Sequence, residues 1–255
     1  MAIAERAGLG IAAEGAAPHR PSALAHRTLV ADCSAKRPGR RACRMTRQRT
    51  GRGGSRNRRG RSSEALSEPA VRGIIAAAEF APAIGLPLNR FTTIHWQKAD
   101  VSDGLAATGR FLKLARDWLR LQGGGFAFVW VREGGPAKGE HVHILLHLPP
   151  DLAPGFRRCV RGWLKASGAS WRRGVMYSRP VGRSLHHALG GDLYTESYRD
   201  HLAAGLGYIL KGATAEARER IGLLRAEAGG LVLGKRSGFS QNLGPSARKH
   251  ALIIG

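Results

Sequence analysis

Three side chains in the middle of the chain have the types and spacing expected of a metal site. Glu133 stands eight residues before His141, and His143 follows two residues later. Side chains two apart on a strand share a face, so both imidazoles would point the same way. If the strands on either side of Ala137 pair as a hairpin, Glu133 comes opposite His141. Two neutral imidazoles and a carboxylate leave positions for phosphate oxygens, which suits Mg²⁺ or Mn²⁺.

Alternatives to this triad remain open at the level of sequence. The two histidines could be core residues, and Glu133 could be a solvated strand end. Glu140 is adjacent to His141 and should point to the other face, so it ranks below Glu133 as a ligand. His147 lies four residues beyond His143, too far along a strand to be a fourth ligand.

A tyrosine with a nearby lysine is the candidate nucleophile. In GYILKG, Tyr208 and Lys211 are three residues apart, which places them on one side of a helix. A phenol with a pKa near 10 needs a cation or metal to stabilise its anion at neutral pH. Lys211 could supply that charge, or it could simply lie over a packed tyrosine. The remaining tyrosines lack such a lysine and are interpreted as structural: Tyr177, Tyr194 and Tyr198.

Hydrophobic periodicity indicates the elements that would position these residues. The pattern predicts an α+β fold, an antiparallel sheet with helices packed on it, in the order β-α-β-β-α-β-α. The expected strands are 90–96, 126–132, 141–148 and 174–181, and the expected helices are 108–122, 151–167 and 198–211. Helix 108–122 places Phe111, Leu114, Ala115, Trp118 and Leu121 on its apolar face. Its basic side chains are candidates for DNA-backbone contacts: Arg110, Lys113, Arg116 and Arg120.

The strand RFTTIHW, the spacing E-(x)7-H-V-H and the helix with Y-I-L-K together resemble the three motifs of HUH endonucleases. The resemblance covers 89–212 and is greatest to replication initiators of rolling-circle plasmids, filamentous phages and small circular DNA viruses. It implies an HUH/RRM-like sandwich in which Thr92 and Thr93 lie in the first motif. Glu133, His141 and His143 would hold Mg²⁺ or Mn²⁺, and Tyr208 would attack single-stranded DNA at a replication origin.

Several features bear on how such an enzyme would work. The tyrosine follows the histidines, and the third ligand is a glutamate, which favours the replication branch over relaxases. No phosphate-binding G-x-x-x-x-G-K-[ST] loop is present, so a host helicase is an expected partner. A relaxase or transposase of the same superfamily, and a non-catalytic nucleic-acid-binding domain on this scaffold, remain alternatives.

Charge also favours a polyanionic partner. Lys and Arg number 41 against 18 acidic residues, a formal net charge of +23. A GC-rich gene would raise the Arg content without any such role. Residues 1–63 are expected to be a disordered basic arm, with Arg56, Arg58 and Arg59 as DNA contacts; alternatively, translation starts at Met45.

The rest of the chain is divided as follows. Residues 64–88 are expected to form a short helix and linker, 89–212 the catalytic domain, and 213–255 a basic extension. In that extension Lys235, Arg236, Arg248 and Lys249 could contact phosphates or be merely solvated. The cysteines Cys33, Cys43 and Cys159 form no C-x-x-C pair, which fits a reducing bacterial cytoplasm. No apolar run is long enough to span a membrane.

Overall fold

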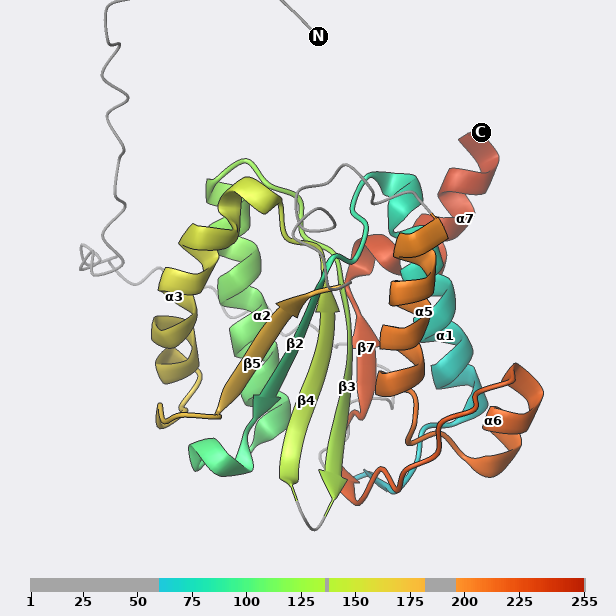
Figure 1. Ribbon diagram of the computed structural model, residues 1–255, viewed down its shortest axis with the longest axis horizontal. Helices are drawn as coiled ribbons and strands as arrows, with labels where there is room; N and C mark the ends of the chain where they lie inside the picture. The colour runs from blue at the N-terminus through green and yellow to red at the C-terminus, as the bar shows by residue number, and fades with distance from the viewer. Residues whose placement is uncertain (1–59, 136–137, 182–195, 255) are drawn as a thin grey trace, which may run out of the picture. The chain divides into compact units, whose positions relative to one another are not determined.

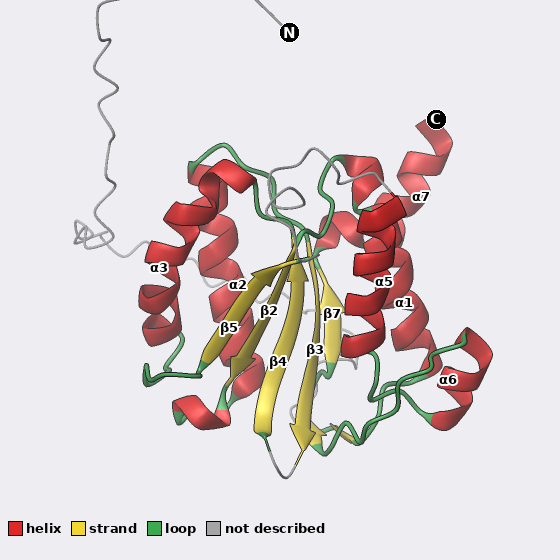
Figure 2. Ribbon diagram, viewed as in Figure 1, coloured by secondary structure: helices red, strands yellow, loops and turns green. Residues whose placement is uncertain are grey.

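A computed structural model describes residues 60–135, 138–181 and 196–254. Its main feature is a five-stranded antiparallel sheet in the order β5-β2-β4-β3-β7, flanked by helices (Figures 1 and 2). The expected α+β class is therefore confirmed. The strands of this sheet are β2 (Arg90–His95), β3 (Phe128–Gly135), β4 (Gly139–Leu146), β5 (Met176–Pro180) and β7 (Ser237–Phe239).

Each face of the sheet carries its own hydrophobic core, because side chains alternate between faces along every strand. One core joins the sheet to α2 (Gly104–Leu121) and α3 (Ala153–Ala166) and includes Ile94 and Ile144. The other joins it to α1 (Glu68–Phe80) and α5 (Glu196–Ile209) and includes Val131 and Leu145. The odd-numbered positions of β3 and β4 thus face α1 and α5.

Helix α2 begins earlier than its apolar periodicity predicts. Asp103 caps it by accepting a hydrogen bond from the Ala106 N–H at 2.9 Å, so the helix starts at Gly104 rather than Thr108. The expectation that Leu121 belongs to the apolar face is wrong, since its side chain is 83% exposed. Leu119 is fully buried instead, because the last turn presents that side to the core.

The expected domain boundaries at 89 and 212 do not separate structural units. Helix α1 begins at Glu68, not Glu64, and its buried face belongs to the α5-side core. Strand β7 completes the sheet by pairing with β3, for example at Val131 and Ser237. The C-terminal part also contains α6 (Ala215–Ile221), β6 (Val232–Leu233) and α7 (Pro245–Ile254). Residues 64–88 and 213–254 are therefore integral to the fold rather than linker and extension.

The boundary proposed at Ser63 is also wrong at its last residues. Ser62–Ser63 form β1, which pairs with β6, and Arg236 donates from its Nε to the Ser63 Oγ at 2.9 Å. Arg236 is 6% exposed and also donates to the carbonyl of Gly229 at 3.2 Å. It is neither a solvated residue nor a phosphate contact, because its guanidinium is used to hold backbone segments together. Within the described ranges, none of the helices has the length and apolar character needed to cross a membrane.

Candidate metal centre

The β3–β4 hairpin brings the three candidate ligands together. Its register places Glu133 directly opposite His141, and Val131 opposite His143, as the turn centred near Ala137 predicts. The possible ligand atoms of Glu133, His141 and His143 lie within 4.8 Å of one another. Both imidazole Nε2 atoms approach the Oε2 of Glu133, at 3.2 Å from His141 and 3.6 Å from His143. The expected convergence of the triad is confirmed.

The triad is buried and incompletely hydrogen-bonded. Glu133 is 4% exposed, so it is not a solvated strand end. Among the described residues, three buried side-chain atoms have no hydrogen-bond partner: Glu133 Oε1, His141 Nε2 and His143 Nε2. Leaving such atoms unpaired is costly in a folded protein, and all three belong to this cluster. Their arrangement fits a bound cation that accepts one lone pair from each.

Hydrogen bonds at the Nδ1 atoms of both histidines orient the rings so that Nε2 points toward Glu133. His141 Nδ1 lies 2.8 Å from the carbonyl of Gly139, so Nδ1 carries the proton and donates it. His143 Nδ1 lies 2.9 Å from the Thr93 Oγ1. The Nε2 lone pair is free when Nδ1 is the donor, as it is in His141; in His143 this arrangement requires the Thr93 hydroxyl to accept from Nδ1. Both rings therefore present Nε2 to Glu133.

The pKa values of Glu133 and His143 are both lowered by their surroundings. Burial lowers the pKa of His143, which favours the neutral ligand form. Burial of Glu133 would raise its pKa, but its contacts with His141, His143 and Lys211 outweigh burial and hold the pKa below its usual range. The carboxylate is therefore ionised, and the site carries the donor set that oxygen- and nitrogen-binding divalent cations require.

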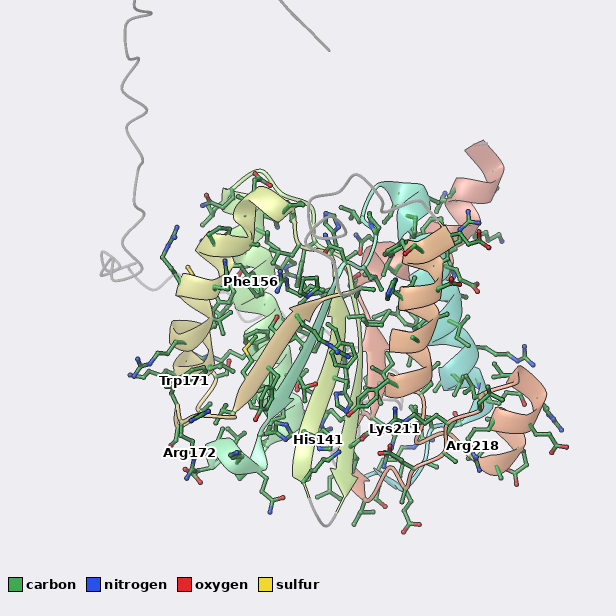
Figure 3. All side chains as sticks on the ribbon, in the orientation of Figure 1. His141, Phe156, Trp171, Arg172, Lys211 and Arg218 are labelled. Atoms are coloured by element: carbon green, nitrogen blue, oxygen red, sulfur yellow. The ribbon has the colours of Figure 1, made fainter. Side chains whose placement is uncertain are left out.

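Lys211 has a different position and partner from those expected. Helix α5 ends at Ile209, so Lys211 lies beyond it, yet its ammonium still comes within 4.5 Å of the Tyr208 ring centre. The Nζ donates to Glu133 Oε2 at 2.6 Å, and the side chain is 2% exposed. In Figure 3, Lys211 and His141 lie at the same end of the sheet. Lys211 therefore neutralises the carboxylate on one oxygen and leaves Oε1 for another cation.

Tyr208 lies on the same face of the sheet as the triad. Its ring contacts the His143 ring edge-on, with centroids 5.0 Å apart, and it packs similarly against Phe91 at 5.6 Å. Tyr208, Thr93, His141 and His143 line one cavity. The expected approach of the tyrosine from the helix over this face is thus observed, and a group bound in the cavity would touch both ring and imidazoles.

The other tyrosines occupy different places. Tyr198 is 1% exposed and donates to the carbonyl of Leu88 at 3.4 Å, in agreement with a structural role. Tyr177 lies in β5 as expected, but it is 60% exposed and lines the cavity beside the triad. The expectation that Tyr177 is only structural is therefore not supported by its position. Tyr194 lies outside the described residues.

The candidate DNA-contacting side chains are not brought to the triad. Helix α2 packs on the opposite face of the sheet, so Arg110, Lys113, Arg116 and Arg120 lie in the other layer. Lys113 and Arg116 both pair with Asp117 on the same helix. A contact of this helix with DNA would be separate from the chemistry at the triad. Arg56, Arg58 and Arg59 lie outside the described residues.

Glu140 and His147 have structural partners. Glu140 pairs with Arg132, whose side chain is 2% exposed, on the face opposite the triad. His147 Nδ1 lies 2.8 Å from the carbonyl of Pro87. Neither belongs to the ligand cluster, as the strand spacing predicts. Thr92 bonds with the Ser178 hydroxyl at 3.0 Å, whereas Thr93 contacts the triad.

Sequence reasoning missed His95 as part of the site. It lies opposite His141 in the β2–β4 register, and the two rings stack with centroids 5.2 Å apart. Burial, followed by the charges of the two triad imidazoles, lowers the pKa of His95 to about 4. The alternation Phe91, Thr93, His95 along β2 was the available signal, since these three residues share the triad's face.

Comparison of the chain with protein families, with characterised proteins and with solved structures finds no match.

Proposed function

We propose that this chain is a metal-dependent endonuclease of the HUH type, which nicks and rejoins single-stranded DNA through Tyr208 and initiates rolling-circle replication. The observation that carries the proposal is a cavity lined by Tyr208 and by His141 and His143, the two histidines of the buried cluster with Glu133. A metal site alone would suit many activities. A phenol beside it suits covalent attack on a phosphate.

The succession of elements also supports the family assignment. Within 89–212 the described elements follow one another as β2, α2, β3, β4, α3, β5 and α5. With the short 3-10 helices left aside, this succession is compatible with the HUH/RRM-like sandwich that we propose. In the proposal, the metal ligands come from the hairpin β3–β4 and the nucleophile comes from α5.

The chain's own residues have distinct tasks in the proposed reaction. Glu133, His141 and His143 would hold Mg²⁺ or Mn²⁺, which supplies Lewis-acid polarisation of a phosphate when bound. Tyr208 attacks the phosphorus through its phenolic oxygen and loses a proton to solvent. The bond from phosphorus to the 3′ oxygen breaks, and that oxygen takes up a proton to become a 3′-hydroxyl. The energy of the broken bond is retained in the 5′-phosphotyrosine, so the reverse reaction rejoins the strand.

Lys211 and Thr93 act through other residues in this scheme. Lys211 holds the Glu133 carboxylate in place and lies over the Tyr208 ring. Thr93 orients His143 through its Nδ1. Both are positioning residues, because neither contacts the reacting atoms directly.

The test is covalent capture. The protein is incubated with a randomised pool of single-stranded oligonucleotides and Mn²⁺, and adducts are separated on a denaturing gel and sequenced. We expect an adduct that needs the metal and is absent from Tyr208→Phe, while Tyr177→Phe retains it. Tyr208→Phe removes only the attacking oxygen, so its affinity for DNA should stay close to that of the unaltered protein.

Two outcomes would contradict the proposal or part of it. Loss of the adduct in Tyr177→Phe, with retention in Tyr208→Phe, would move the nucleophile to β5. Binding of DNA without any adduct under all metal conditions would favour a non-catalytic nucleic-acid-binding domain. The sequence captured in the adduct would separate an initiator from a relaxase or transposase.

A further inference from the structure

A second cavity adjoins the one at the candidate metal centre and includes Tyr208 among its walls. The two cavities share Phe91, Arg179 and Tyr208 as walls, and the second extends to His201 and Arg225. The register of β2 with β5 explains the order: Thr93 and Tyr177 lie beside the triad, and Phe91 and Arg179 lie one step further along. The two cavities therefore meet at Phe91, Arg179 and Tyr208, between the histidines of the triad and Arg225.

The second cavity combines aromatic rings with guanidinium groups. The Arg179 guanidinium lies 5.5 Å from the Phe91 ring centre, and that of Arg225 lies 4.7 Å from the Tyr208 ring centre. Arg179 and Arg225 are both exposed; Arg225 donates to Glu227 from its Nε and Nη2, and its Nη1 remains for a ligand. No acidic side chain lines either cavity within the described residues. Rings with guanidinium groups are the combination that binds a base and its phosphate in single strands.

Arg225 is tied to the metal centre through a chain of ion pairs. It donates to Glu227 at 2.8 Å, and Glu227 lies 3.5 Å from the Lys211 ammonium. Lys211 in turn binds Glu133. The Glu227 N–H also donates to the Lys211 carbonyl at 3.0 Å, which holds this segment beside Tyr208. Arg225 and Glu227, which follow α6 and lie beyond 89–212, thus connect the second cavity to the candidate metal centre.

The chemistry of the proposed attack determines which part of a DNA strand lies there. In an in-line displacement at phosphorus, the attacking and leaving oxygens are on opposite sides. The leaving 3′ oxygen, with the upstream strand, therefore lies away from Tyr208. The downstream nucleotide stays bonded to the phosphate and hence to Tyr208. Because the second cavity includes Tyr208 as a wall, we expect the downstream nucleotide rather than the leaving strand to lie there.

We propose that the cavity formed by Phe91, Arg179, His201, Tyr208 and Arg225 is a subsite for the nucleotide immediately downstream of the scissile phosphate. The nucleotide's base stacks on Phe91, and the next phosphate binds Arg179 and Arg225. The assignment of this cavity to the downstream rather than the upstream nucleotide rests on the proposed function. It adds a task for this cavity, which includes Arg225 from beyond 89–212: to retain the 5′-linked strand until it is rejoined.

The test uses two fluorescent oligothymidylates of equal length, one with a 5′-phosphate and one with a 5′-hydroxyl, with Mn²⁺ present. We expect the full chain to bind the 5′-phosphorylated strand more tightly, because it mimics the downstream product. Arg179→Gln and Arg225→Gln should each weaken that binding about tenfold, the effect of removing a charged hydrogen bond to phosphate. Arg179→Lys should restore part of it, and Arg199→Gln, an exposed change on α5 outside the cavity, should leave it unchanged.

A site-directed crosslink locates the ligand independently of affinity. A 5-iododeoxyuridine placed first after the 5′-phosphate should crosslink to Phe91 or Tyr208. Equal binding of the two strands, or an equal decrease in Arg179→Gln and Arg199→Gln, would overturn the subsite. Crosslinking of the strand upstream of the scissile phosphate to this cavity, in place of the downstream strand, would overturn the proposed direction of the strand. These outcomes are separate from adduct formation: an adduct without a 5′-phosphate effect leaves the proposed function standing, and the effect without an adduct refutes that function.

Discussion

Lys211 donates a 2.6 Å hydrogen bond to Glu133 Oε2, and both side chains are almost fully buried. The pair places a fixed positive charge on one oxygen of the carboxylate and leaves the other without a partner. A buried ion pair contributes little net stability by itself, but removing one partner leaves an uncompensated charge. The pair holds Glu133 in its ionised form, which is the form that a cation would bind.

Lys211→Met should destabilise the metal-free protein by about 3–5 kcal/mol, because Glu133 is left buried without its ammonium partner. Mn²⁺ should recover part of this stability by binding the carboxylate. Urea unfolding with Mn²⁺ and with a chelator measures both quantities. Glu133→Gln added to Lys211→Met should recover stability without metal. An identical destabilisation with and without Mn²⁺ would argue against a cation at Glu133.

Glu140 and Glu133 differ in what their removal should change. Glu140→Gln weakens the partner of the buried Arg132 and should lower the free energy of unfolding by about 2 kcal/mol. Because Glu140 is on the face opposite the triad, affinity for Mn²⁺ should not change. Glu133→Gln should abolish that affinity. Calorimetric titration with Mn²⁺ beside urea unfolding distinguishes the two, and an absence of Mn²⁺ binding in Glu140→Gln would show that the ligand is wrongly assigned.

Stability should depend on pH through histidines that resist protonation in the fold. Burial lowers the pKa of His143 and of His147, and that of His95 falls to about 4. The unfolded chain takes up protons near a pH of about 6.5, which the folded chain does not accept until lower pH. Stability is therefore complete above that pH and decreases as the pH falls toward about 4.

Urea unfolding without metal at about pH 7 and about pH 5 measures this dependence. His147→Gln should reduce the difference between the two values, since Gln can donate to the Pro87 carbonyl without titrating. His250→Gln, a change at a side chain exposed on α7, is the control. Stability that increases on acidification would contradict the direction of these pKa shifts.

Removal of residues 1–59 tests the basic arm. This cut keeps β1 and the Arg236 contacts with Ser63, which a cut after residue 63 would destroy. Adduct formation should persist, while the salt dependence of non-specific binding to single strands should become shallower, by about 0.7 for each phosphate that the arm neutralises. An unchanged slope, measured by fluorescence anisotropy across salt concentrations, would show that the arm does not bind DNA.

The convergence of Glu133, His141 and His143 could be predicted from sequence because strand geometry determines it. Alternation places His141 and His143 on one face, and a hairpin centred near Ala137 admits one register for Glu133. Helix α5 was similarly recognisable from its apolar spacing. The elements predicted best are those long enough for the hydrophobic pattern to repeat several times.

Other features depend on contacts between distant segments and leave no local pattern. The three residues of β7 carry no alternation that identifies a strand, and the buried Arg236 donates to the carbonyls of Ser63, Arg132 and Gly229, which are distant in sequence from one another. The side of the sheet covered by α2 follows from which strand face is apolar around Ile94 and Ile144. His95 and Arg225 join the site only through tertiary packing, so their roles could not be assigned from spacing.

The most direct test of the account is a crystal structure of the full chain with Mn²⁺, with anomalous scattering recorded for manganese. We predict one strong anomalous peak at about 2.0–2.3 Å from Glu133 Oε1 and the Nε2 atoms of His141 and His143. Lys211 should remain on Oε2, and the peak should be absent from His143→Ala. A well-ordered triad without manganese, or manganese bound only elsewhere, would contradict the central claim that this cluster is a metal centre.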